Sequence, residues 1–206
     1  LTIVKGGQTI TFNAPPPPTY APDGGFGVTA SASSGLPVTF SSTTPGVCTV
    51  AGNTVFMLSA GNCTITANQA GNDNYNPAAP MSQTISIAKA QPVLILSANP
   101  GIIQVGGTST LSTKRGSTGA IRYTVSGPCT LVGANTLQGN AIGICRVTAE
   151  QDADGNYDAG QSSPVTITVR TALAPASIPT LSEWGLLLLM LLLVLTGGWY
   201  RKKVSA

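Results

Sequence analysis

The stretch that decides the fold is CTVAGNTVFMLSAGNCTIT, residues 48–66. Its β-branched and aromatic residues come in three short runs, and runs of this kind are typical of β-strands: Cys48–Val50, Val55–Leu58 and Cys63–Thr66. Gly52-Asn53 separates the first two runs, as in a tight turn. We therefore expect three short strands, with a cysteine opening the first and the third.

The pattern recurs later in the chain. Equivalent landmarks lie 81 or 82 residues apart: Cys48 and Cys129, Cys63 and Cys145, Asn74-Tyr75 and Asn156-Tyr157, Thr84–Ile87 and Thr166–Val169. This offset predicts two repeats, residues 7–89 and 90–170. Leu1–Lys5 is similar to Ile85–Lys89, so we expect residues 1–6 to be the last strand of a truncated preceding repeat, with more copies upstream.

Each repeat contains about seven short strand-like segments. Thr9–Phe12, Val38–Phe40 and Thr84–Ile87 add to the three runs above, and turn residues separate them. Pro15–Pro18 is expected to form an extended loop, because proline cannot donate to a sheet ladder. Strands at a spacing of 8–12 residues are typical of an immunoglobulin-like sandwich. The predicted fold is therefore all-β, with tandem immunoglobulin-like β-sandwiches.

The first repeat resembles the bacterial immunoglobulin-like repeats of large cell-surface proteins. The resemblance covers residues 8–89, and four features carry it: Ser34–Val38, the Gly52–Val55 turn, Ala70–Asn72 and Asn74-Tyr75. The second repeat departs from this pattern, with Arg122–Val125 where the first has Pro37–Phe40. Its assignment rests more on the offset than on the motif.

Each repeat carries two cysteines, 15 and 16 residues apart. Four cysteines allow three pairings, and the repeat pattern favours Cys48–Cys63 and Cys129–Cys145. A metal site is disfavoured because the chain has no His; free buried thiols are the other alternative. A disulfide closing a loop of this size stabilises a domain by about 3 kcal/mol in the chain-entropy model. Disulfides also imply an oxidising compartment.

Charge is scarce and unevenly placed. Charged residues make up 8% of the chain, and the net charge is +3. Arg201, Lys202 and Lys203 lie together near the C-terminus, and without them basic and acidic residues balance. A neutral body offers no electrostatic footprint for nucleic acid. We therefore exclude nucleic acid as a partner.

The composition changes after Arg170. Residues 171–177 form an Ala/Pro-containing linker, and Trp184–Tyr200 contains no charged residue. As a helix this segment spans about 25 Å, the short end of what crosses a hydrocarbon core of about 30 Å. We predict a single transmembrane helix at about 184–200. The basic cluster Arg201–Lys203 should stay cytoplasmic, which puts the repeats on the periplasmic side of the inner membrane.

The segment 178–206 resembles the IPTL-CTERM sorting signal of Gram-negative bacteria. Six residues carry the motif ahead of the apolar run and the basic cluster: Ile178, Pro179, Thr180, Leu181, Trp184 and Gly185. The resemblance implies an exosortase-like peptidase as partner, which would cut near the motif before transfer to the cell surface or outer envelope. Pro179 would keep the motif extended in front of the helix. A plain membrane anchor is the alternative.

One acidic cluster has the spacing of a calcium loop: Asp152, Asp154, Asn156 and Asp158. Gly155 is out of place for such a loop, however, and Ser163 stands where a bidentate Glu should close it. The pattern therefore favours an ordinary turn, and we predict neither metal nor cofactor. Tyr75 and Tyr157 recur in phase and are expected to pack at a strand corner with the hydroxyl bonded to backbone.

No catalytic constellation is recognisable. The absence of His excludes His-based triads, and no phosphate-binding Gly-rich loop is present. We expect a non-enzymatic exported surface protein whose repeats act as stalk or adhesion modules, and whose C-terminal segment directs membrane anchoring and sorting. An extracellular protein or a glycan is the class of ligand expected for adhesion modules. The alternative is a spacer or binding array and anchor for a surface enzyme with its catalytic domain upstream.

Overall fold

The computed structural model describes residues 3–172, 187–188 and 191. The chain divides into two units, Leu1–Arg170 and Thr171–Ala206. Residues 3–172 form strands joined by turns and loops, without a helix. The all-β prediction is therefore confirmed for this part of the chain. We refer to residues 7–89 as the first sandwich and to residues 90–170 as the second sandwich.

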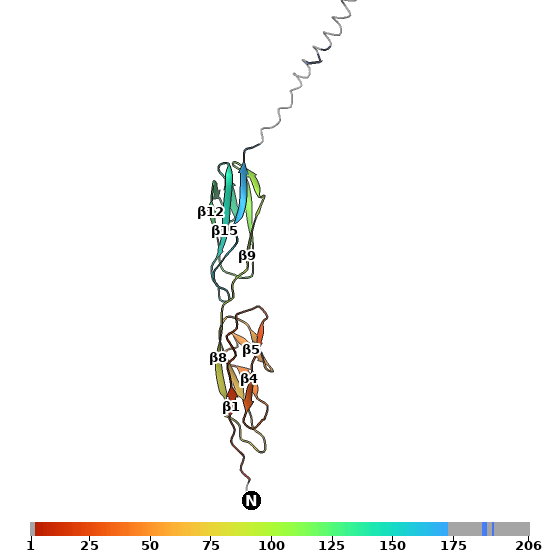
Figure 1. The fold of residues 1–206 in the computed structure, drawn as a ribbon, viewed down its shortest axis with the longest axis vertical. Helices are drawn as coiled ribbons and strands as arrows, with labels where there is room; N and C mark the ends of the chain where they lie inside the picture. The colour runs from red at the N-terminus through yellow and green to blue at the C-terminus, as the bar shows by residue number, and fades with distance from the viewer. Residues whose placement is uncertain (1–2, 173–186, 189–190, 192–206) are drawn as a thin grey trace, which may run out of the picture. The chain divides into compact units, whose positions relative to one another are not determined.

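The first sandwich contains strands β1 to β8, of which Figure 1 labels β1, β4, β5 and β8. Their bounds are β1 Ile10–Phe12, β2 Gly25–Gly27, β3 Ala30–Ala32, β4 Thr39–Ser42, β5 Cys48–Ala51, β6 Thr54–Met57, β7 Gly61–Asn68 and β8 Met81–Ile87. They form three sheets with the orders β1-β3, β2-β6-β5 and β4-β7-β8. The Gly52-Asn53 turn joins β5 to β6, and Gly52 has a φ of +61°, which glycine adopts without strain.

Alternation along β7 builds the core of the first sandwich. Cys63, Ile65 and Ala67 point inward and are fully buried, as a period of two residues requires. They belong to one cluster of buried residues that extends from Ile10 to Ile87. Phe12 lies against Phe40 in this cluster, with ring centroids 5.5 Å apart.

The second sandwich contains β9 to β17. Their bounds are β9 Leu94–Asn99, β10 Ile102–Gln104, β11 Thr108–Arg115, β12 Ile121–Ser126, β13 Cys129–Leu131, β14 Thr136–Gly139, β15 Gly143–Gln151, β16 Gly160–Gln161 and β17 Val165–Arg170. One sheet has the order β13-β14-β11-β9 and the other β10-β17-β15-β12, with β16 beside β15. Its buried residues form a separate cluster, from Leu94 to Val169.

The register corrects one detail of the sequence comparison. Phe40 pairs with Ala67 in the first sandwich, and Tyr123 pairs with Ala149 in the second. Since Ala149 is the counterpart of Ala67 at the offset of 82, Tyr123 is the counterpart of Phe40. Arg122–Val125 therefore aligns with Thr39–Ser42 and not with Pro37–Phe40, and the apparent departure of the second repeat at this point is a shift of register.

Two short strands of the first sandwich were not predicted from the sequence. β2 and β3 are each three residues long and rich in Gly, Ala and Ser, so they lack the β-branched signal of the other strands. The Pro15–Pro18 run lies outside the strands, as predicted. Its last residue nevertheless joins the edge of β8, because the Pro18 carbonyl accepts a hydrogen bond from the Ala88 amide at 2.9 Å.

Candidate functional sites

Both predicted disulfides are present. Cys48 of β5 is bonded to Cys63 of β7, and Cys129 of β13 to Cys145 of β15. The Cα–Cα distances are 5.7 and 5.9 Å, well inside the range that a disulfide spans. In each case the two strands belong to different sheets. Each bridge therefore ties the two layers of its sandwich together.

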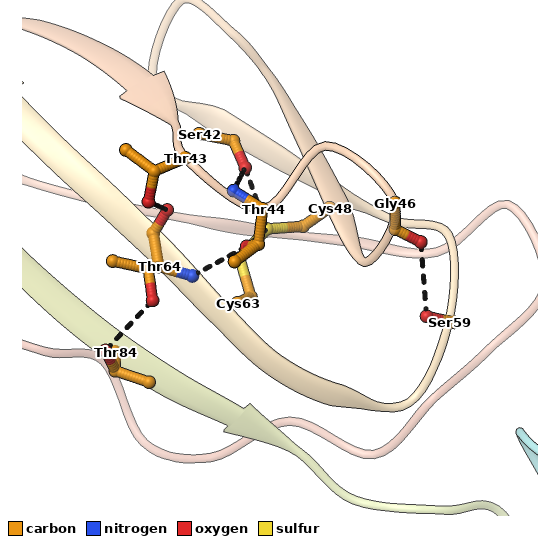
Figure 2. Close-up of a disulfide and its surroundings, with 9 residues drawn as sticks. All are labelled: Ser42, Thr43, Thr44, Gly46, Cys48, Ser59, Cys63, Thr64 and Thr84. Carbon is orange, nitrogen blue, oxygen red and sulfur yellow. Dashed lines mark hydrogen bonds between the residues drawn. A yellow bond between two sulfur atoms is a disulfide. The ribbon is translucent and has the colours of Figure 1, made fainter.

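Hydroxyl groups surround the first bridge, as Figure 2 shows. The hydroxyl oxygens of Ser42 and Thr44 lie 3.4 and 3.6 Å from the Cys48 sulfur. The Thr44 hydroxyl also accepts a hydrogen bond from the Thr64 amide at 2.9 Å, and the Thr64 hydroxyl lies 3.0 Å from that of Thr84. These bonds join the loop before β5 to β7 and β8, beside a disulfide whose two cysteines are fully buried.

A second candidate site is the turn after the longest strand of each sandwich. In the second sandwich Asp154 Oδ1 accepts hydrogen bonds from the amides of Asn156 and Tyr157, both at 2.8 Å. In the first sandwich Asn72 Oδ1 accepts from the amides of Asn74 and Tyr75, both at 2.9 Å. The same side-chain-capped turn is thus built twice, once with a carboxylate and once with an amide.

Asp154 has further donors, which change its acidity. Its Oδ2 accepts from the Thr118 amide at 2.8 Å and from the Thr118 hydroxyl at 2.9 Å. These donors lower the pKa of Asp154 from 3.8 to about 2; the Thr118 amide contributes most, followed by the Asn156 amide. Hydrogen bonds to the charged form favour it, so Asp154 stays ionised well into acid solution.

The acidic cluster that resembles a calcium loop is engaged with protein groups. Asp152 forms an ion pair with Arg122, and Asp158 Oδ2 accepts from Gln91 Nε2 at 2.9 Å. Asp154 caps the turn described above. Within the described residues no three His, Cys, Asp or Glu side chains gather in a manner that could hold a metal ion. The contacts favour the ordinary turn.

The link between the two sandwiches is itself paired. Ala90 forms a parallel bridge with Tyr157. Its amide donates to the Asn156 carbonyl, and its carbonyl accepts from the Asp158 amide, both at 2.9 Å. Lys89 Nζ donates to the Asp154 carbonyl at 2.6 Å. The capped turn of the second sandwich therefore holds the segment that enters it.

Two contacts reach across from the first sandwich to this turn. The amide of Ala60, just before β7, donates to Asn156 Oδ1 at 2.9 Å. The ring of Tyr20 meets the ring of Tyr157 edge to face, with centroids 5.7 Å apart. Edge-to-face pairs at this separation are favourable because the positive edge of one ring faces the negative face of the other. We call this set of contacts the junction.

The prediction for the recurring tyrosines is only partly right. Tyr157 packs through its ring on Tyr20, and Tyr75 lies at the equivalent turn, where its ring is next to Gly6. In residues 3–172 neither hydroxyl has a backbone partner, so the predicted hydroxyl bond is wrong. The ring, rather than the hydroxyl, makes the contact in each case.

Sequence reasoning missed the other half of the junction. Tyr20 lies in the loop after the proline run and Ala60 contributes only a backbone amide, so neither stands out by residue type. A signal was present in the recurrence of Asn-Tyr at residues 74–75 and 156–157. Lys5 and Lys89 also hold equivalent places, each just before the residue that pairs with the turn.

The predicted sorting and membrane residues lie outside the described part of the chain. This holds for Ile178, Pro179, Thr180, Leu181, Trp184 and Gly185, and for Arg201, Lys202 and Lys203. Of the predicted helix at 184–200, the structure describes Leu187, Leu188 and Leu191, which are helical. Among the described residues there is no helix long and apolar enough to cross a membrane.

Comparison with protein families confirms the resemblance at the C-terminus. The family model described as "IPTL-CTERM motif" matches residues 176–202. This span contains all the sorting residues named above and the basic cluster up to Lys202. The chain therefore carries a sorting motif of this kind behind its repeats, which indicates an exported cell-surface protein.

Comparison with solved structures finds S-layer and cadherin proteins at low similarity. A crystal structure of the S-layer protein rSbsC(31-844) is similar over 84% of this chain and 29% of its own, with 16% identity and a TM-score of 0.32. SbsC domains 4 and 5 are similar over 80% of this chain and 98% of theirs, with 18% identity and a TM-score of 0.28. Drosophila N-cadherin EC1-4 is similar over 80% and 48%, with 15% identity and a TM-score of 0.26. Among curated proteins no match is found.

Proposed function

We propose that this chain is the spacer and sorting portion of an exported surface protein. The sandwiches supply length and stiffness as a stalk or adhesion module, and the C-terminal segment supplies anchoring and address. The segment performs no catalysis of its own in this proposal. The observation that carries it is the order of the parts: two disulfide-bridged β-sandwiches, joined without a loose linker, precede an IPTL-CTERM motif.

Stiffness follows from how the sandwiches are joined. A flexible linker would leave its backbone groups to water, whereas Ala90 bonds through both its amide and its carbonyl. The Tyr20–Tyr157 pair and the bond from Ala60 add contacts on either side. A connection restrained at several points transmits orientation from one sandwich to the next, which a spacer requires.

The topology in this proposal is a single span of the inner membrane at about 184–200. Arg201–Lys203 stays in the cytoplasm, because basic residues resist translocation. The sandwiches then lie on the periplasmic side, where disulfides form and persist. An exosortase-like peptidase cuts near residues 178–185 and passes the protein to the cell surface or outer envelope. An extracellular protein or a glycan is the proposed class of ligand if the repeats act in adhesion.

Mass spectrometry of the C-terminus of the mature protein, taken from its native host, tests the sorting step. We expect a new C-terminus near Ile178–Gly185 and loss of the basic cluster. Pro179→Ala tests whether an extended motif is needed, and Ser177→Ala is the matched control in the linker. Retention of Ala206 on the mature surface protein would favour a permanent anchor instead.

A further inference from the structure

The junction has two sides, and both are made of few groups. The second sandwich presents the side-chain oxygen of Asn156 and the ring of Tyr157. The first sandwich presents the amide of Ala60 and the ring of Tyr20. The entering segment, Lys89 and Ala90, is fixed in between by backbone pairing. We call the Asn156–Tyr157 side the socket and the Ala60–Tyr20 side the plug.

The first sandwich has a socket of its own. Asn74 and Tyr75 follow Asn72 in the same capped turn that presents Asn156 and Tyr157 after Asp154. In both turns the capping residue also donates its amide to the tyrosine carbonyl, at 3.0 Å from Asn72 and at 3.0 Å from Asp154. The backbone that carries the socket is therefore the same in the two sandwiches.

A segment already enters this second socket in the manner of Ala90. Gly6 forms a parallel bridge with Tyr75. Its amide donates to the Asn74 carbonyl, and its carbonyl accepts from the Asn76 amide, both at 2.8 Å. Both equivalent bonds at the junction measure 2.9 Å. Lys5 precedes Gly6 just as Lys89 precedes Ala90, so the entering segment is in place and in register.

The Ala60 amide and the Tyr20 ring contact Asn156 and Tyr157. Within residues 3–172 no equivalent groups contact Asn74 and Tyr75. Asn74 is exposed, whereas Asn156 is half-buried. The ring of Tyr75 lies beside Gly6, and no second aromatic ring meets it among the described residues. The first sandwich thus carries a formed socket with its entering segment, and Asn74 of this socket is exposed to solvent.

We propose that the Asn74–Tyr75 socket docks a further sandwich of the same type as residues 7–87. Its strand would enter through Val4 and Lys5, its tyrosine at the place of Tyr20 would meet the Tyr75 ring, and its amide at the place of Ala60 would donate to Asn74 Oδ1. The occupant follows from continuity with the junction, where the same groups are already engaged. The inference rests on the proposed spacer function for its meaning, but the docking can be tested without sorting.

The opposite end of the second sandwich gives this stacking a direction. Val105 donates its amide to the Arg170 carbonyl as Tyr20 does to that of Ala88, so Val105 holds the place of Tyr20. Ile142 precedes Gly143, which pairs with Val169 as Gly61 pairs with Ile87, so it holds the place of Ala60. At these two described positions the second sandwich therefore has aliphatic side chains and no aromatic ring to offer a socket. The second sandwich can therefore follow a repeat of the first type but lacks the plug for another.

The test extends the full chain by one sandwich and observes one ring. Residues 1–87 are joined to residues 4–206, so that Val4 follows Ile87 and keeps the native entry to the socket. A 3-fluorotyrosine is placed at residue 75 of the original copy and followed by fluorine NMR in detergent. In the unextended chain the resonances at residues 75 and 157 are expected to differ in chemical shift. In the extended chain we expect the resonance at residue 75 to shift toward that at residue 157 by most of this difference.

One variant and two controls make the result specific. Tyr20→Ala in the added copy should return the resonance to its position in the unextended chain. The resonance of 3-fluorotyrosine at residue 157 should not move in the extended chain or in its Tyr20→Ala variant, which shows that the existing junction is intact. Mass spectrometry without reduction should find three disulfides in the extended chain.

Three results would overturn the proposal. The resonance at residue 75 could stay in place on extension, or it could move and fail to return with Tyr20→Ala. It could also depend on protein concentration in the unextended chain, which would assign the socket to a second copy of the chain. None of these results bears on where the C-terminus is cut, so docking and sorting are judged separately.

Discussion

The two sandwiches share their interior and their capped turns but differ on their outer faces. On the sheet β4-β7-β8 the outward residues are all hydroxyl or amide side chains: Thr39, Ser41, Asn62, Thr64, Thr66, Asn68, Ser82, Thr84 and Ser86. The equivalent face of β10-β17-β15-β12 carries four charged residues: Arg122, Arg146, Glu150 and Arg170. The inward alternation and the capped turns are repeated, whereas several outward positions, such as Thr39 and Arg122, have changed.

A buried glutamine shows how far the shared plan tolerates change. Gln69 directly follows β7, Gln151 is the last residue of β15, and both are almost fully buried. Gln69 Oε1 accepts from the Gly71 amide at 2.5 Å and also bonds Gln8. Gln151 instead donates to the Ser117 carbonyl at 3.1 Å, and its Oε1 has no partner among the residues that the structure describes. The position is kept polar in both, while the groups that satisfy it come from different loops.

The bridges are the shared feature with the largest expected effect. Cys48→Ala with Cys63→Ala should destabilise the first sandwich by about 3 kcal/mol, because the unfolded chain gains the freedom of a loop of this size. For a domain of this length that is a drop in Tm of about 12–24 °C. Cys129→Ala with Cys145→Ala should lower the Tm of the second sandwich by the same amount. Calorimetry of the full chain measures both transitions.

Ser41→Ala is the control for these variants, since it removes only an outward hydroxyl and should change stability by less than about 0.5 kcal/mol. If the removal of a disulfide left the Tm of its sandwich unchanged, the stabilising role that we assign to that disulfide would be contradicted. Clearly unequal losses would break the equivalence of the two sandwiches, and would show that one of them has enough core to fold without its bridge.

At the junction the socket of the second sandwich is occupied, whereas that of the first is exposed. Changes to the junction should have the next largest effect on stability. A double-mutant cycle of Tyr20→Ala and Tyr157→Ala should give a coupling of about 0.5–1.5 kcal/mol, the usual worth of an edge-to-face pair beyond its buried area. The cycle is measured by thermal unfolding of the full chain. Tyr75→Ala is the matched control, and a coupling of similar size between Tyr20 and Tyr75 would contradict the contact.

The sequence predicted what depends on periodicity and missed what depends on shape. Strands such as β7 and β8 are visible because their inward residues alternate with hydroxyl residues. The disulfides followed from the repeat offset, since equivalent cysteines lie at equivalent places. The plug could not be predicted, because every residue type except proline has a backbone amide like that of Ala60. The role of Tyr20 becomes apparent only when its ring meets that of Tyr157.

The acidic residues illustrate the same limit. Their alternate spacing fits a calcium loop, but spacing does not say which donors surround each carboxylate. The Thr118 amide and hydroxyl, 36 residues away in sequence, are what occupy Asp154 Oδ2. A contact of this kind can be found only after the fold has brought the two loops together.

Acid solution should separate the two capped turns. The pKa of Asp154 is about 2 in the folded chain and near 3.8 without these donors. Its contribution is therefore present above about pH 3.8 and is lost as the pH falls toward 2. Asp154→Asn should remove this part of the acid destabilisation of the second sandwich, because an amide keeps the Oδ1 acceptor without titrating. Unfolding followed from pH 5 to pH 2 measures it.

Asn72→Asp is the reciprocal variant, and it should make the first sandwich more sensitive to acid over the same range. The comparison is made between each variant and its parent, so the other carboxylates, which titrate in both, cancel. If Asp154→Asn left the acid limb of the second sandwich unchanged, the donors around Asp154 would not govern its titration.

The smallest effect belongs to the charges of the outer face. Arg122 pairs with Asp152, but the two side chains are 67% and 43% exposed. Exposed pairs are worth about 0.2–1 kcal/mol, since water screens them and two flexible side chains must be ordered. Arg122→Thr, which installs the residue found at Thr39 in the first sandwich, should therefore cost less than about 1 kcal/mol.

The ion pair can also be transplanted, because Thr39 and Ala70 are the counterparts of Arg122 and Asp152. Thr39→Arg alone should leave the first sandwich unchanged, and Thr39→Arg with Ala70→Asp should gain about 0.2–1 kcal/mol at low salt. That gain should fall toward zero in 1 M salt, where the screening length is about 3 Å. A gain that persists in high salt would mean that the outer face contributes through packing, and the division between repeated interior and variable exterior would have to be redrawn at this strand.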